Sequence, residues 1–184
     1  MASRSESAAA DLLALALTRP PTLGAGRLVC VDGPAGSGKT TLAAALVALA
    51  PDATVIHTDD LLEGWDGLPG LARSVATLLE PLAAGRTGHW RRWDWHASAW
   101  AETREVSPAS LLILDGVGSW SPAIAPWVTA LAWVEAAYDL RMARGLARDG
   151  DAFAPHWDRW AADEEELFAR TGTRDAADLV VVTG

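Results

Sequence analysis

The stretch Gly33-Pro-Ala-Gly-Ser-Gly-Lys-Thr40 decides the fold class of this chain. It fits the pattern G-x-x-x-x-G-K-[ST] in full, and in that pattern the backbone amides wrap around phosphate oxygens. An apolar run, Leu28 to Val31, precedes it, and a helix-favouring run at 39–50 (KTTLAAALVALA) follows it. We therefore predict a phosphate-binding loop between a buried strand and a helix. Its predicted phosphate-binding residues are Gly33, Ala35, Gly36, Ser37, Gly38, Lys39, Thr40 and Thr41.

Length and charge narrow the classes of function. The chain has 184 residues, which suits one domain (1–184), and its formal net charge is −9. A net negative charge argues against broad electrostatic binding to nucleic acid or to anionic membranes. No apolar run approaches the roughly 20 residues that a membrane span needs. We expect a cytoplasmic protein, monomeric or homodimeric, that binds neither nucleic acid nor membrane.

Short apolar runs alternate with helical patterns along the chain. Runs at 28–31, 54–57, 111–114, 131–135 and 179–182 are typical of buried strands. Helical spacing is found at 8–18, within an N-terminal extension (1–22), and at 39–50, 71–84, 138–149 and 157–171. The segments at 62–70 and 88–104 read as a loop and an irregular segment. This alternation predicts an α/β, three-layer fold with a parallel sheet of about five strands and helices on both faces.

Acidic residues follow two of the predicted strands. Asp115 ends the run LLILD and would emerge beside the phosphate-binding loop, where with Thr40 it could hold Mg²⁺. Asp59 and Asp60 follow the run at 54–57 and would lie at the same edge. We predict that Asp59 is a general base and that Asp60 contacts substrate. The alternatives are a turn-capping aspartate at 115 and a helix-capping pair at 59–60. His57 receives no role.

Three arginines lie on one face of the helix predicted at 138–149. Arg141, Arg144 and Arg148 are spaced by three and four residues. We interpret 138–172 as a lid and the helix that follows it, in which Arg141 and Arg144 assist catalysis and Arg148 binds the nucleotide. The alternative is a solvated basic face paired with the acidic residues at 163–166.

The segment HWRRWDWHASAW (89–100) is rich in tryptophan. Aromatic rings there could stack on a flat substrate group while polar side chains bind its hydroxyls. The alternatives are a hydrophobic flap and an oligomer contact. The candidate substrate residues in this region are Trp65, Trp93, Asp94 and His96.

These segments together resemble the uridine kinase branch of the P-loop small-molecule kinases, from about residue 27 to 184. The resemblance rests on DGPAGSGKTTLA (32–43), HTDDLL (57–62), RWDWH (92–96), LDG (114–116), LRMARGLARD (140–149) and ADLVVVTG (177–184). It implies that Asp59 is the general base and that 177–184 lies beside the adenine site. It also implies that the helix predicted at 138–149, here called the arginine helix, is a phosphate-binding lid. The chain departs from that family where Leu61 and Leu62 replace an aromatic residue and where Asp115 replaces the usual glutamate.

The sequence thus predicts an enzyme that transfers the γ-phosphate of Mg-ATP to a hydroxyl group of a small molecule, with a nucleoside as one candidate acceptor. Two alternatives stay open at this point. One is a kinase for another small metabolite, and the other is an ATP-binding switch protein without phosphotransfer activity.

Overall fold

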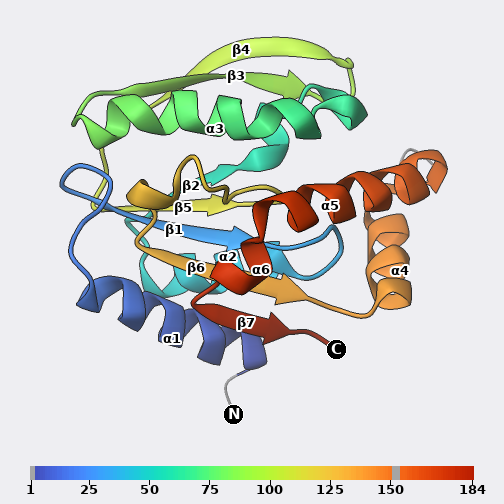
Figure 1. Ribbon diagram of the computed structural model, residues 1–184, viewed down its shortest axis with the longest axis horizontal. Coiled ribbons are helices and arrows are strands. Elements are labelled where there is room, and N and C mark those ends of the chain that lie inside the picture. Colours follow the sequence, from blue (N-terminus) through green and yellow to red (C-terminus); the bar gives the residue numbers. More distant parts are fainter. Residues whose placement is uncertain (1–2, 151–153) are drawn as a thin grey trace.

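A five-stranded parallel sheet forms the centre of the computed structural model, which describes residues 3–150 and 154–184 (Figure 1). The strand order is β2-β5-β1-β6-β7. All four neighbouring pairs are parallel, which confirms the α/β fold and the sheet that the sequence predicts. The strands are β1 (Arg27–Asp32), β2 (Thr54–His57), β5 (Leu111–Asp115), β6 (Ala130–Glu135) and β7 (Leu179–Val182).

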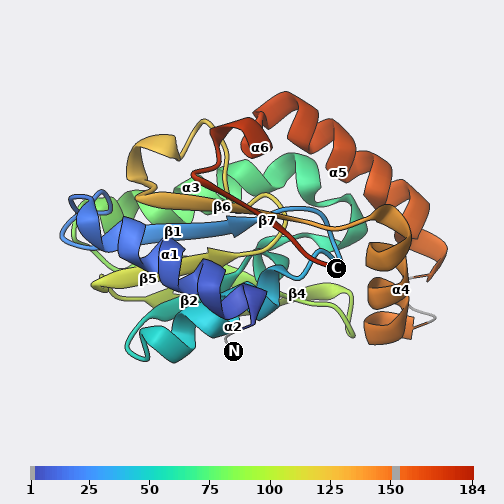
Figure 2. The same ribbon diagram turned by 90° about the horizontal axis from the view of Figure 1, so that it is seen from below.

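Helices cover both faces of this sheet (Figures 1 and 2). On one face lie α1 (Arg4–Thr18) and α2 (Lys39–Leu49), and on the other lie α3 (Leu68–Ala83) and α5 (Trp157–Thr171). Further along the chain, α4 (Tyr138–Asp149) stands at the carboxyl edge of the strands and α6 (Thr173–Ala176) precedes β7. The described residues also form four 3₁₀ turns: η1 (Thr58–Leu61), η2 (Gly64–Asp66), η3 (Ala125–Trp127) and η5 (Ala154–His156).

Two hydrophobic cores follow from the alternation of side chains along the central strand. In β1, Val29 and Val31 point into the core under α1 and α2, whereas Leu28 and Cys30 point into the core under α3 and α5. All four side chains are fully buried, as expected for a strand covered on both faces. These cores hold β1 in place and so fix the position of the loop that follows it.

Two helices begin earlier than predicted. α1 begins at Arg4 because Ser3 and Glu6 form a capping box that satisfies free backbone N–H groups. α3 begins at Leu68 because Pro69 lies in the first helical turn, where a missing N–H group costs nothing. Helix ends depend on such local capping, which the apolar pattern does not register.

The structure corrects the interpretation of 88–104 as irregular. This segment is an antiparallel hairpin of β3 (Gly88–Asp94) and β4 (Ala99–Val106), packed over α3 (Figure 1). Its register shifts between Arg91 and Trp93, which marks a β-bulge. The shift breaks the two-residue alternation by which strands are recognised, and most of both strands stays at least partly exposed. The apolar pattern therefore lacked the signal of a strand.

Within 3–150 and 154–184, no helix combines the length and apolar character needed to cross a membrane.

Candidate functional site

The predicted phosphate-binding loop connects strand β1 to helix α2, and its shape depends on glycine. Gly33 and Gly36 have φ values of +140° and +73°, which side chains rarely allow. A Cβ atom at Gly33 would lie 2.1 Å from the Val134 carbonyl oxygen, and one at Gly36 would lie 2.3 Å from that of Arg141. The loop can therefore pack against β6 and α4 only with glycine at these positions. α2 then starts at Lys39 with no side chain capping its first N–H groups, which leaves them able to bind an anion.

Lys39 turns back over this loop. Its side chain is 8% exposed, and Nζ donates a hydrogen bond to the Pro34 carbonyl oxygen at 3.0 Å. The ammonium group is thus held beside the loop amides by a neutral partner. Its full positive charge remains available to phosphate oxygens.

Asp115 stands at the carboxyl end of β5 and meets the loop there. Its Oδ2 atom accepts a hydrogen bond from the Thr40 hydroxyl at 3.1 Å and lies 3.1 Å from Nδ1 of His57. The side chain of Asp115 is 2% exposed, and its Oδ1 atom is buried without a hydrogen-bond partner in the described part of the chain. The hydrogen bond to Asp115 raises the pKa of His57. Sequence reasoning left His57 without a role, although the parallel register places it directly opposite Asp115.

The surroundings of Asp115 fit a magnesium ion. The buried Oδ1 atom lacks a partner, and the hydroxyl group of Thr40 adjoins the same carboxylate. That arrangement suits Mg²⁺, which keeps several waters and binds through one or two protein oxygens plus substrate phosphates.

A second buried carboxylate, Asp32, anchors the loop from behind. It is fully buried and accepts hydrogen bonds from the backbone N–H groups of Gly33, Gly118 and Trp120 at 2.7, 2.9 and 2.8 Å. Burial raises its pKa to about 7, although these bonds and the charge of Lys39 act in the opposite direction. Asp32 therefore joins the start of the phosphate-binding loop to the loop after β5. Sequence reasoning missed it, but a charged residue ending an apolar run was a usable signal.

Asp59 lies in η1, directly after β2. Its side chain is exposed to solvent, yet the surrounding protein displaces enough water to raise its pKa, and the charge of Asp115 adds to this. The positive charges of Lys39 and Arg148 act in the opposite direction. These electrostatic contacts place Asp59 near both the phosphate-binding loop and the arginine helix.

The neighbouring Asp60 is oriented differently. Its Oδ2 atom accepts a hydrogen bond from Arg104 on β4 at 3.2 Å. This ion pair ties η1 to the hairpin.

Two of the three predicted arginines on α4 touch the phosphate-binding loop. Arg141 donates to the Ala35 carbonyl oxygen at 3.2 Å and Arg144 to that of Gly36 at 3.4 Å. Arg144 also donates to the Thr183 hydroxyl at 2.9 Å. Arg148, one turn further on, is exposed, and its charge acts on Asp59. The row of arginines thus runs from the phosphate-binding loop towards Asp59.

The acidic helix α5 also reaches this loop. Glu164, 2% exposed, accepts hydrogen bonds from the Ala35 N–H group and from Nε1 of Trp160, each at 2.7 Å, and pairs with Arg141 at 3.4 Å. Among the described contacts, Arg141 and Glu164 join α4 to the acidic residues at 163–166, but this pair is buried, whereas the alternative interpretation expected a solvated one. Burial raises the pKa of Glu164. No sequence pattern distinguished Glu164 from its acidic neighbours.

The structure brings some of the predicted substrate residues to Asp59 and directs others elsewhere. Nε1 of Trp95 donates to the Asp59 carbonyl oxygen at 3.1 Å, and Trp65 packs edge-on against Trp95 with ring centroids 5.0 Å apart. Trp65 also stacks on His156 at 4.6 Å. An aromatic wall therefore stands beside Asp59, and it includes Trp95, which sequence reasoning did not single out as a site residue.

The other predicted substrate residues belong to the hairpin. Trp93 packs against Trp100 within it. The Asp94 carboxylate accepts hydrogen bonds from the backbone N–H groups of His96 and Ala97 and pairs with Arg92. Asp94 thus shapes the hairpin turn, and the side chain of His96 is exposed at its tip.

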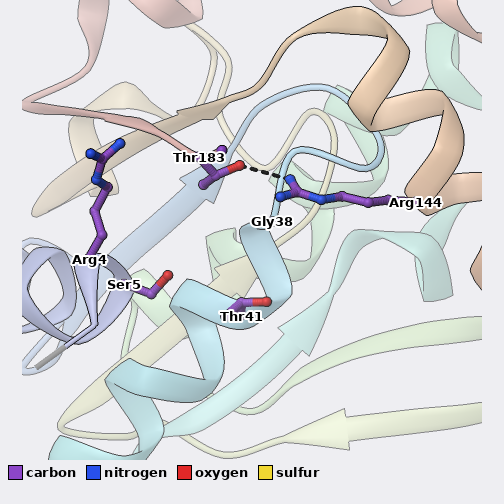
Figure 3. A pocket seen from close by; sticks show the side chains of 7 residues that line it. Arg4, Ser5, Gly38, Thr41, Arg144 and Thr183 are labelled. Atoms are coloured by element: carbon purple, nitrogen blue, oxygen red, sulfur yellow. Dashed lines mark hydrogen bonds between the residues drawn. The ribbon is translucent and has the colours of Figure 1, made fainter.

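A cavity of about 530 Å³ opens beside the phosphate-binding loop (Figure 3). Its wall combines the start of α1, the start of α2, the arginine helix and the end of β7. Thr183 binds the Ser37 carbonyl oxygen at 2.7 Å, and Arg4 binds that of Val182 at 2.8 Å. The residues lining the cavity are Arg4, Ser5, Gly38, Thr41, Arg144, Thr183 and Gly184.

Comparison with known proteins identifies the fold. No family model matches the sequence, and no protein of curated function matches it. Among solved structures, a possible uridine kinase from Bacillus stearothermophilus is similar, with a TM-score of 0.66 at 18% identity over 97% of each chain. A candidate fructose transport system kinase from Silicibacter sp. TM1040 gives a TM-score of 0.59 at 21% identity, over 98% of this chain and 99% of that one. The protein therefore has the fold of a uridine kinase-like P-loop kinase.

Proposed function

We propose that this protein is an ATP-dependent phosphotransferase that moves the γ-phosphate of Mg-ATP to a hydroxyl group of a small molecule. The observation that carries the proposal is the contact between the Thr40 hydroxyl and the Asp115 carboxylate beside Lys39. A phosphate-binding lysine, a hydroxyl group and a carboxylate with a free buried oxygen are the groups that hold a metal-bound triphosphate.

The donor nucleotide would bind along the phosphate-binding loop. Its phosphates would lie on the loop amides and Lys39, and its base would enter the 530 Å³ cavity that Arg144 and Thr183 help to line. Thr40 and Asp115 would hold Mg²⁺, which supplies charge neutralisation at the phosphate oxygens when it is bound. Arg141, Arg144 and Arg148 would stabilise the charge that develops during transfer.

Asp59 would accept the proton of the acceptor hydroxyl group. The hydroxyl oxygen forms a bond to the γ-phosphorus, the bond from that phosphorus to the bridging oxygen of ADP breaks, and the hydroxyl proton passes to the Asp59 carboxylate. The position of Asp59 near Lys39 and Arg148 supports this role. The aromatic wall of Trp65 and Trp95 would keep water from the reacting phosphate.

The acceptor would lie between η1, η2 and the hairpin. A cavity of about 360 Å³ opens there, lined by Leu61, Glu63, Asp66, Gly67, Gly70, Ser74 and Trp100. Its aromatic and carboxylate groups suit a compound rich in hydroxyl groups. The two similar structures are described as a possible uridine kinase and a candidate fructose transport system kinase, and uridine and fructose both carry hydroxyl groups. We therefore place nucleosides and sugars first among the candidate acceptors.

The test is ADP release from Mg-ATP against a panel of nucleosides, nucleotides, sugars and other hydroxyl compounds. We expect one class to stimulate release and Lys39→Ala to reduce the stimulated rate by about 10³-fold, since it removes a charge that contacts the transferring phosphate. The folded state of the variant would be checked by thermal unfolding. ATP binding without stimulation by any member of the panel would instead favour a nucleotide-binding switch protein.

A further inference from the structure

Glu164 differs from the acidic residues around it on α5. Glu165 and Glu166 are exposed, but the Glu164 side chain is 2% exposed and points at the tip of the phosphate-binding loop. Its Oε1 atom accepts the Ala35 N–H group and Nε1 of Trp160, and its Oε2 atom faces Arg141. Each of these neighbours donates a hydrogen bond, so the surroundings of the Glu164 carboxylate suit its ionised form. A buried charge without such partners would strongly destabilise the fold.

Arg141, the cationic partner, is enclosed on several sides. Its guanidinium group lies over the rings of Tyr138 and Trp157, with centroids 5.5 and 5.9 Å away, and its side chain is 12% exposed. Only the NH1 nitrogen makes hydrogen bonds within the described residues, to Ala35 and to Glu164. The NH2 and Nε groups are left free of hydrogen bonds there. One edge of the guanidinium group is therefore fixed, and its other donors can bind an oxyanion.

We propose that Glu164 is a positioning residue that acts through Arg141. Its carboxylate holds the Ala35 peptide and one nitrogen of Arg141 together, and so fixes the guanidinium group at the rim of the loop before the nucleotide arrives. This inference rests on the proposed binding of ATP at that loop. A donor that is already ordered binds a phosphate without the entropic cost of ordering a long side chain. Arg144, by contrast, contacts neutral oxygens, the Gly36 carbonyl and the Thr183 hydroxyl, so a bound triphosphate can draw it away at little electrostatic cost.

The test measures Mg-ATP affinity by isothermal titration calorimetry in a double-mutant cycle of Glu164→Gln and Arg141→Gln. We expect each single change to weaken binding about tenfold. Glutamine at position 164 can still accept the hydrogen bond from Ala35 but lacks the charge that holds Arg141. Glutamine at position 141 removes the guanidinium group itself. The double variant should bind like Arg141→Gln alone, within about twofold. Glu165→Gln is the matched control, since it makes the same change at an exposed position of the same helix and should leave the affinity unchanged.

Two results would overturn the role of Glu164. One is wild-type affinity in Glu164→Gln, and the other is a double variant whose fold-loss of ATP affinity equals the product of the two single fold-losses. Independent losses of that kind would mean that Glu164 only supports the fold. If Glu164→Gln does not fold, Glu164→Asp replaces it, because aspartate keeps the charge and loses the reach. Wild-type affinity in Glu164→Asp would then count against the role. A wild-type protein that does not bind ATP would refute the proposed function, which is a different outcome from either of these.

Discussion

The two sides of the proposed reaction centre are built from different material. The donor side is the phosphate-binding loop, a continuous stretch of backbone anchored by the buried carboxylates Asp32, Asp115 and Glu164. The acceptor side consists of side chains on η1, η2 and the hairpin β3–β4, which come from two separate parts of the chain, 58–66 and 88–106. Exposed ion pairs such as Arg104 with Asp60 and Glu102 hold this side together.

This difference has a consequence for function. A site made of glycine-dependent backbone and buried charges tolerates few substitutions, because each change leaves a clash or an unpaired charge. A site made of partly exposed side chains on a two-stranded ribbon can change at little cost in stability. We therefore expect donor-side changes to affect folding or nucleotide binding, and acceptor-side changes to affect mainly turnover or the choice of acceptor.

The sharpest separation of the two sides should come from Asp59→Asn. We expect turnover to fall about 10²-fold or more, because the variant cannot accept the proton of the acceptor hydroxyl group. The affinity for Mg-ATP should stay within about twofold, since the phosphate-binding loop is intact. Steady-state kinetics with the best acceptor and calorimetric ATP titration measure both quantities. Asp52→Asn, an exposed position at the other end of β2, is the control. Normal turnover in Asp59→Asn would remove the general base from the proposed mechanism.

On the donor side, Asp32 should make stability depend on pH. Its carboxyl pKa is about 7 in the folded protein against 3.8 as the ordinary value, so between these values the folded state binds more protons and stability falls as pH rises. From pH 5 to 6.5 we expect the unfolding free energy of the wild type to fall by roughly 2 kcal/mol relative to Asp32→Asn. Urea denaturation at both pH values measures this. A constant difference would show that the three backbone hydrogen bonds keep the carboxylate ionised throughout.

A change in the aromatic wall should affect the acceptor more than ATP. Trp95→Phe keeps an aromatic ring against Trp65 but removes the hydrogen bond to the Asp59 carbonyl oxygen. We expect the KM for the acceptor to rise about fivefold while the affinity for Mg-ATP is unchanged. Trp90→Phe is the matched control, because Nε1 of Trp90 makes no hydrogen bond within the described residues. An equal rise in the acceptor KM for Trp95→Phe and Trp90→Phe would contradict the placement of Trp95 on the acceptor side.

The smallest effect is expected from Arg104→Gln. This arginine and its partner Glu102 are 45% and 50% exposed, so water screens the pair strongly. We expect the unfolding free energy to change by less than about 0.5 kcal/mol, as measured by urea denaturation. A much larger loss would mean that the hairpin contributes to the stability of the whole domain, and that the acceptor side is less free to vary than we infer.

Local patterns were enough for the architecture of this protein but not for the hairpin. The parallel sheet could be predicted because each strand is a short apolar run and each intervening helix has its own periodicity. The hairpin could not, because its β-bulge shifts the register and its strands are partly exposed. The helix starts at Arg4 and Leu68 were missed because capping is decided by single residues.

The sequence by itself determined the glycine-rich loop after β1, the alternation of the five parallel strands with helices, and the spacing of the arginines on α4. These features depend on neighbouring residues, and glycine or an apolar run has nearly the same meaning wherever it occurs. Only the tertiary structure decided that Glu164 reaches Ala35, that Asp32 joins two loops, that His57 faces Asp115, and that Trp95 lies beside Asp59. Those contacts join residues far apart in the chain, and their geometry comes from how strands and helices pack, which local sequence patterns do not record.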